Sequence, residues 1–116
     1  MKVLRIVANI ETADLEKADA FYRDVLGLDL AMDQGWIRTY TAKAKTNVQV
    51  SFAAEGGSGT LLPQLSIEVD DLEEAMRRVN KAALPIEYGP TSEPWGVRRF
   101  YVRDPFGKLI NVLQHE

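Results

Sequence analysis

The chain contains no cysteine, which excludes disulfide bonds, thiolate nucleophiles and cysteine-ligated metal sites. It has no apolar run near the roughly 20 residues of a membrane-spanning helix, and its first residues lack the long apolar core and cleavage site of a signal peptide. It also has no run of Lys or Arg, and its net charge is only −3, which does not favour nucleic acid as a partner. These absences predict a cytoplasmic protein that binds neither membrane nor nucleic acid.

What the chain does contain is a balance typical of a soluble globular domain. Hydrophobic residues make up 46% and charged residues 27% of its 116 residues. This length fits one domain of ordinary size, which can bury a core without disulfides or metals. We therefore expect a single domain over residues 1–116.

The first half of the chain predicts a strand, a helix and three further strands. Residues 3–11 are mostly apolar with interspersed polar residues, as in a strand with one buried face. Asp14 then begins a helix, and Gly27 suits its C-terminal end. The apolar stripe of this helix recurs at steps of three and four residues: Leu15, Ala18, Tyr22 and Val25. The further strands are predicted at residues 28–32, 36–42 and 47–53.

Residues 55–60 contain three glycines within four positions, which predicts a flexible linker between two halves of the chain. The alternative is a glycine-rich phosphate-binding loop. Such a loop needs a following helix whose N-terminus faces the phosphate. Residues 61–65 resemble the start of a strand instead, so we favour the linker.

The second half repeats the pattern of the first. Residues 65–69 predict a strand, and Asp71 with Glu74 three positions later has the spacing of a capping box. The apolar stripe of the helix that follows is Leu72, Ala75, Met76 and Val79. A short strand at residues 86–88, a loop at 89–94 and a closing hairpin at 97–103 and 108–114 complete the half. Asp104, Pro105 and Gly107 supply the turn of that hairpin.

The two halves align at a shift of 57 residues, which places Asp14-Leu15-Glu16 on Asp71-Leu72-Glu73. Internal repetition of this length indicates two units that bury their apolar faces together. We therefore predict an α+β fold in which two βαβββ modules form a curved mixed sheet with helices on the convex face. Module 1 covers about residues 1–54 and module 2 about residues 61–116. The concave face is the expected ligand site.

Two motifs resemble a known family. These are Asp-Pro-x-Gly-x-Leu-Ile at residues 104–110 and Phe-Tyr followed by Leu-Gly at residues 21–27. Both are similar to motifs of the vicinal oxygen chelate superfamily, which contains glyoxalase I, extradiol dioxygenases and bleomycin-resistance proteins. The resemblance covers almost the whole chain and implies the fold more than the activity.

The resemblance also implies where a metal site would lie in this chain. Members that use a metal take ligands from the first strand of each module and from the closing strand. These positions fall on Val7, Gln64 and Asn111. A divalent transition metal prefers imidazole or carboxylate ligands, so an aliphatic side chain and two neutral amides predict a poor site. We expect neither a metal nor another cofactor.

A shift of the alignment by two residues keeps the same strand face and places Asn9 and Ser66 at the ligand positions. These two residues are no better as metal ligands. A shift of four reaches Glu11 and Glu68, which match each other across the repeat. These carboxylates suit a cation or a basic ligand group, although solvated strand ends are the commoner role for Glu. His115 is the only histidine, and its position near the chain end does not favour a catalytic role.

Aromatic and basic residues are the stronger indication of ligand binding. Trp36, Arg38 and Tyr40 alternate along one predicted strand and therefore share a face. Packing of that face in the core or at a subunit contact is the alternative. Trp95 lies in a loop rich in Gly and Pro, which favours binding over packing, and Trp suits planar ligands. The predicted ligand-binding residues are Trp36, Arg38, Tyr40, Gln64, Trp95, Asn111, Glu11 and Glu68.

Three classes of function remain open at the level of sequence. The first is a homodimeric member of the bleomycin-resistance type that binds a small planar aromatic or cationic compound in a crevice, as in antibiotic resistance, without chemistry. The second is a metal-dependent lyase, isomerase or dioxygenase of the glyoxalase I type, in which the metal acts as a Lewis acid. The third is a structural or regulatory domain. The poor metal ligands favour the first class.

Overall fold

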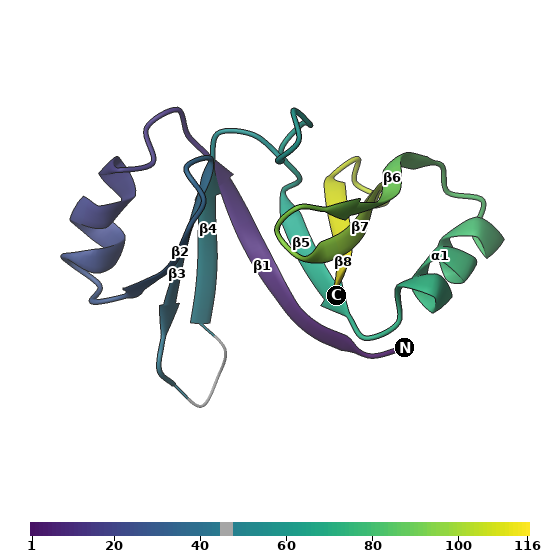
Figure 1. Cartoon of the computed structure of the whole chain (residues 1–116), viewed down its shortest axis with the longest axis horizontal. Coiled ribbons are helices and arrows are strands. Elements are labelled where there is room, and N and C mark those ends of the chain that lie inside the picture. The colour runs from purple at the N-terminus through teal and green to yellow at the C-terminus, as the bar shows by residue number, and fades with distance from the viewer. Residues whose placement is uncertain (45–47) are drawn as a thin grey trace. The chain divides into compact units, whose positions relative to one another are not determined.

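The computed structural model describes residues 1–44 and 48–116, and it has an α+β fold with parallel and antiparallel strand pairs (Figure 1). The strands are β1 (Val3–Glu11), β2 (Asp29–Asp33), β3 (Ile37–Ala42), β4 (Val48–Ala53), β5 (Leu65–Val69), β6 (Ile86–Glu93), β7 (Val97–Arg103) and β8 (Leu109–His115), and the helices are the π-helix η1 (Asp19–Arg23) and α1 (Leu72–Lys81). The chain divides into an N-terminal unit, Val7–Leu62, and a C-terminal unit, Met1–Ile6 together with Pro63–Glu116.

In the N-terminal unit the strands follow the order β2-β3-β4-β1, and β1 pairs with β4 in parallel through Ala8–Glu11. The helical segment around η1 lies against these strands (Figure 1). Its core contains Ala18, Tyr40 and Phe52, with Leu15 and Tyr22 packed beside them. The first predicted residue of β4, Asn47, lies outside the described residues.

The predicted apolar stripe of this helical segment is wrong at Val25, whose exposed fraction is 66%. The backbone explains the difference. Asp24 N donates to Asp19 O at 2.9 Å and Leu26 N donates to Phe21 O at 3.0 Å, five residues back along the chain. Such π-type bonds add a residue to the turn and rotate the later residues away from the stripe expected for an α-helix.

The glycine-rich segment forms a hydrogen-bonded turn. Gly56 N donates to Thr60 O at 2.9 Å, Thr60 N donates to Gly57 O at 3.0 Å, and Gly59 N donates to Glu55 Oε1 at 3.0 Å. The composition predicted a flexible linker, and these hydrogen bonds give the segment a defined conformation. Strand β5 follows it, without the helix that a phosphate-binding loop requires.

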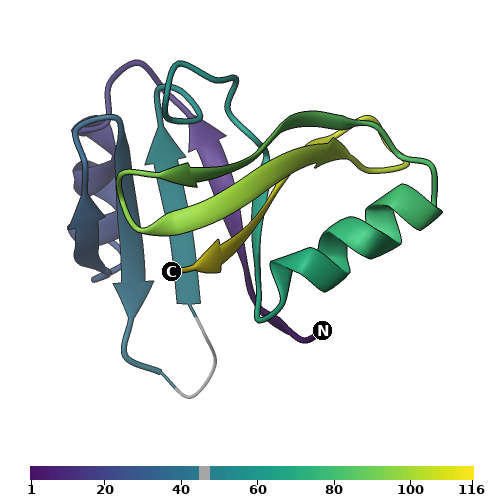
Figure 2. The same ribbon diagram turned by 45° about the vertical axis from the view of Figure 1, so that its right-hand side comes forward.

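In the C-terminal unit the strands follow the order β1-β5-β8-β7-β6, and β5 pairs with β8 in parallel. Helix α1 runs along one face of these strands (Figure 2). Its predicted cap is confirmed, because Asp71 Oδ1 accepts a hydrogen bond from Glu74 N at 3.1 Å. The core between helix and strands contains Val69, Leu72, Ala75, Phe100, Val102, Ile110 and Val112.

The prediction of a loop at residues 89–94 is wrong, because β6 continues to Glu93. In its pairing with β7, Thr91 lies opposite Arg99 and Glu93 lies opposite Val97. An irregularity between Tyr88 and Thr91 absorbs Gly89 and Pro90, whose peptide bond is cis. The strand therefore continues past a glycine and a proline, two residue types that ordinarily end a strand. Among the described residues no helix is long and apolar enough to cross a membrane.

Candidate functional site

The face of the C-terminal unit that lies opposite α1 carries most of its buried polar side chains. Ile67, Phe100 and Val112 point toward α1, so the residues next to them in each strand point to the other face. We call this other face the polar face; it contains Ser66, Glu68, Arg99, Tyr101, Asn111 and His115, together with Tyr88, Glu93 and Trp95, which contact Arg99 or each other.

Arg99 occupies the centre of an aromatic cluster on this face. Its guanidinium carbon lies 4.9 Å from the ring centroid of Trp95, 5.0 Å from that of Tyr101 and 5.4 Å from that of Tyr88. Arg99 Nη2 donates to Glu93 Oε2 at 2.7 Å, and the Tyr88 hydroxyl donates to Glu93 Oε1 at 3.0 Å. The side chains of Arg99 and Glu93 are only 3% and 4% exposed. The guanidinium of Arg99 therefore occupies the place beside these rings that a cationic ligand would take.

Asn111 is the buried amide at the middle of the polar face. Its Nδ2 donates to Ser66 Oγ at 3.1 Å across the β5–β8 pair, and the residue is 7% exposed. Its Oδ1 is buried and has no hydrogen-bond partner among the described residues. An unsatisfied buried acceptor costs about 1–3 kcal/mol, so a donor group brought to this oxygen would be stabilising.

Glu68 joins three strands at the end of the polar face. Its Oε1 accepts from Arg5 Nε of β1, and its Oε2 lies 2.9 Å from His115 Nδ1 of β8. Partial burial by itself raises the pKa of Glu68, but hydrogen bonds and charges from His115 and Arg5 outweigh it and lower the pKa below its ordinary value. Glu68 therefore remains ionised at neutral pH. Its basic partners are Arg5 and His115 of the same chain.

The structure brings three of the predicted ligand-binding residues onto the polar face, namely Glu68, Trp95 and Asn111. Gln64 lies just before β5, is exposed, and donates its backbone N–H to Leu109 O at 2.9 Å. Sequence reasoning missed Glu93, because the segment that carries it was predicted as a loop. It also missed the pairing of His115 with Glu68, for which no local sequence signal exists.

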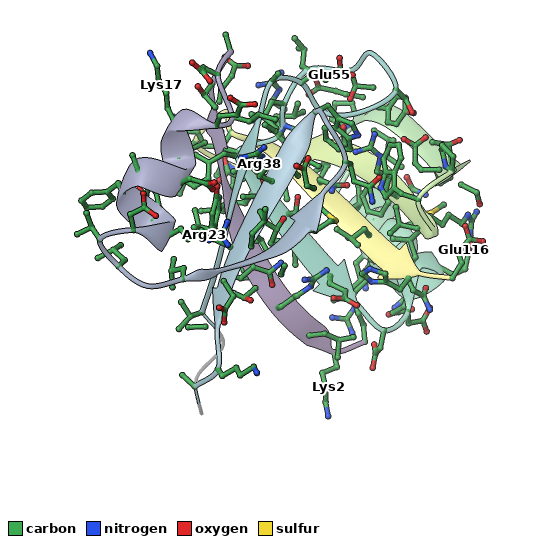
Figure 3. The ribbon with its side chains drawn as sticks, turned by 60° about the vertical axis from the view of Figure 1, so that its left-hand side comes forward. Lys2, Lys17, Arg23, Arg38, Glu55 and Glu116 are labelled. Carbon is green, nitrogen blue, oxygen red and sulfur yellow. The ribbon has the colours of Figure 1, made fainter. Side chains whose placement is uncertain are left out.

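The predicted residues of β3 lie in the N-terminal unit. Tyr40 is fully buried against Phe52 in the core, and its hydroxyl donates to Asp19 of η1. Arg38 lies 3.3 Å from Asp33 and 3.7 Å from Asp19, beside the helical segment (Figure 3). These contacts support the packing alternative for both side chains. Trp36 is half-buried, and its carbonyl accepts from Ala54 N at 3.0 Å.

The residues that the family resemblance implied as metal ligands are weak ligands when each is taken by itself. Val7 is apolar and 5% exposed, Gln64 and Asn111 offer only amide atoms, and Glu11 is an exposed residue at the end of β1. Among the described residues, no three His, Cys, Asp or Glu side chains gather into a metal-binding group. A transition metal prefers imidazole, thiolate or carboxylate, and Val7, Gln64 and Asn111 supply none of these groups.

Comparison with protein families identifies one match. The model of the Glyoxalase/Bleomycin resistance protein/Dioxygenase superfamily matches residues 4–112. A search of curated protein sequences found no match.

Several solved structures share the fold. A glyoxalase/bleomycin resistance protein/dioxygenase superfamily member from Vibrio splendidus 12B01 is 22% identical, with a TM-score of 0.69 over 99% of this chain and 100% of that chain. Methylmalonyl-CoA epimerase from Mycobacterium tuberculosis is 22% identical, with a TM-score of 0.67 over 95% and 86%. A structure described as NAD-dependent benzaldehyde dehydrogenase from Legionella pneumophila is 17% identical, with a TM-score of 0.74 over 97% and 100%. At these identities the likeness concerns the fold alone.

Proposed function

The chain belongs to the Glyoxalase/Bleomycin resistance protein/Dioxygenase superfamily, and from this membership and the polar face we propose that it binds a small planar compound without a bound metal. The observation that carries the proposal is the unsatisfied Oδ1 of Asn111, a buried acceptor at the middle of that face. A ligand N–H or O–H group that reaches this oxygen would recover the free energy that its burial costs.

The composition of the polar face favours a planar ligand that carries no positive charge. Trp95, which is half-buried, offers aromatic surface. A cationic ligand finds less support, because the guanidinium of Arg99 already lies between the rings of Trp95 and Tyr101. Glu68 and Glu93 are likewise paired with Arg5 and Arg99.

The second candidate function is a metal-dependent lyase, isomerase or dioxygenase, which other members of the superfamily suggest. Its chemistry requires a Lewis-acidic metal held by anionic or imidazole ligands. The amides of Gln64 and Asn111 support this candidate poorly. Elemental analysis of the purified protein separates the two, since one Zn, Ni, Mn or Fe per chain would favour the enzyme.

We expect replacement of Asn111 by leucine to weaken binding of the planar ligand by about tenfold, because the side-chain volume is kept while one hydrogen bond is lost. The measurement is tryptophan fluorescence in a Trp36→Phe background, in which Trp95 is the one remaining tryptophan. Titration with a panel of aromatic amides, phenols and aromatic carboxylates identifies the compound that gives the strongest response.

The matched control for this experiment is Asn80→Leu, which replaces an exposed amide on α1, the helix that covers the other face of the strands. It should leave the fluorescence titration unchanged. A ligand that binds equally well to the Asn111→Leu variant would contradict the assigned hydrogen bond. A response that persists in Trp95→Phe and vanishes in Trp36→Phe would move the binding site to the N-terminal unit.

We propose further that two copies of the chain form a homodimer. Strands β2 and β6 are edge strands, which proteins usually pair or cover. The N-terminal unit also exposes apolar side chains, with 52% of Phe21, 66% of Val25 and 53% of Leu26 accessible. Sedimentation equilibrium should give twice the chain mass of 13.0 kDa. A mass of one chain at micromolar concentration would contradict the dimer.

A further inference from the structure

His115 has the surroundings of an oriented imidazole. It is the last residue of β8, and its side chain is 52% exposed. Its Nδ1 lies 2.9 Å from Glu68 Oε2, which is an acceptor because the carboxyl is ionised. The proton of the neutral ring must therefore reside on Nδ1, which leaves a lone pair on Nε2. No hydrogen bond or ion pair of Nε2 is found within the described residues.

The carboxylate that orients this ring is itself held in place. Arg5 Nε donates to Glu68 Oε1, so both carboxylate oxygens are engaged, one by β1 and one by β8. The Glu68 side chain is 16% exposed, against 52% for His115. A fixed carboxylate on Nδ1 and an accessible Nε2 form the arrangement in which a carboxylate sets the tautomer of a histidine base and stabilises its protonated form.

The strand neighbour of His115 adds no charge beside its half-exposed imidazole. Across the strand pair it faces Val97 of β7, which carries no charge. Glu116 follows it in the chain, and Glu116 N donates to Gly96 O at 2.9 Å. That bond holds the turn that carries Trp95 next to the end of β8. The charged groups around the imidazole are thus Glu68 from β5, Arg5 from β1 and the adjacent Glu116.

We propose that His115 is a general base that removes a proton from a planar ligand bound on the polar face, so that the protein turns over carbon acids and does not only bind them. The inference rests on the proposed function for the presence of a ligand. The proton passes from the ligand C–H to Nε2, and the C–H electron pair stays on the ligand. The imidazolium keeps Nδ1–H on Glu68, and water or the product later takes the proton from Nε2.

The direct test uses 5-nitrobenzisoxazole, a planar carbon acid. The base takes the proton from its C3, the C–H electron pair becomes part of a new C≡N bond, and the N–O bond breaks to leave a phenolate that absorbs visible light. We expect saturable turnover. General-base catalysis typically contributes about 10²- to 10⁴-fold, so His115→Asn should lower the rate by about 100-fold.

Glu68 is a positioning residue in this scheme, because it acts through His115. In Glu68→Gln the ring is no longer restricted to the Nδ1–H tautomer, and we expect a smaller loss, on the order of tenfold. The matched control is Glu73→Gln on α1, which removes a carboxylate paired with Arg98 on the outside of the unit and should retain the full rate.

A second readout does not depend on turnover. Nitrogen-15 NMR of the protein, which contains one histidine, should show the neutral ring protonated at Nδ1 in the wild type and in Glu73→Gln, but not in Glu68→Gln. Turnover that is equal in the wild type and His115→Asn, or absent from both, would overturn the inference. Fluorescence titration tests the proposed function separately. A ligand that binds without turnover would support the binding function and would contradict only the role of His115 as a base.

Discussion

Replacing Glu93 by glutamine is expected to lower the free energy of unfolding by about 3 kcal/mol, which urea denaturation measures directly. The Arg99 guanidinium is 3% exposed and lies 2.7 Å from the Glu93 carboxylate, which is 4% exposed. The substitution removes the buried negative charge that faces this guanidinium. The cation–π contacts of Arg99 with three rings are individually weaker than such a buried ion pair.

The control for Glu93 is Glu87→Gln. Glu87 also pairs with an arginine, Arg103, at 2.9 Å, but the two side chains are 38% and 43% exposed. Exposed pairs contribute about 0–1 kcal/mol, so this variant should unfold almost as the wild type does. The double variant Glu93→Gln/Arg99→Met should recover part of the loss, because neither member of this buried pair then carries a charge. Equal losses in Glu93→Gln and Glu87→Gln would show that burial does not control the value of these pairs.

Replacing Gly89 by alanine is expected to lower the free energy of unfolding by about 3 kcal/mol, because the added Cβ causes both backbone strain and a steric clash. A Cβ at this position would lie 2.5 Å from the carbonyl oxygen of Arg99 and 3.2 Å from Phe100 Cα, both of which are backbone atoms of β7. The φ of +80° adds about 1–2 kcal/mol for a side chain, and forced overpacking adds about 1–3 kcal/mol. Because β7 carries Arg99, which contacts Trp95, the strain should also weaken ligand binding.

Gly35→Ala separates the two sources of strain. Gly35 has a φ of +85°, but no atom lies within 4 Å of a Cβ built there. It should therefore lose only the conformational part, about 1–2 kcal/mol, in the same urea experiment. Similar losses in both alanine variants would mean that β6 and β7 move apart freely, and the close approach at Gly89 would then have no energetic consequence.

Local features of the fold could be predicted from the sequence because their causes are local. Asp71 accepts from Glu74 N three residues later, and Asp104 Oδ1 accepts from Phe106 N and Lys108 N at 2.9 Å within the closing turn. Strand β1 and the closing hairpin were predicted within a residue of their bounds. Predictions failed where the register changes, as in the π-type turn at η1 and the irregularity in β6 at Gly89.

The candidate site was less predictable, because contacts between strands decide the role of each side chain. The alternation of Arg38 and Tyr40 was read correctly as a shared face, but only the tertiary structure places that face against Asp19. In the same way, Trp95 was predicted to bind a ligand, whereas its contact with Arg99 depends on the pairing of β6 and β7.

The sequence by itself determined the family, the strand and helix pattern, and the residue types at the positions that the resemblance implies for metal ligands. These follow from residue types and short spacings. Only the tertiary structure decided that Glu68 holds His115, 47 residues away, and that Asn111 meets Ser66 but keeps one amide oxygen unsatisfied. The physical reason is that such contacts depend on the parallel register of β5 and β8, which no local pattern specifies.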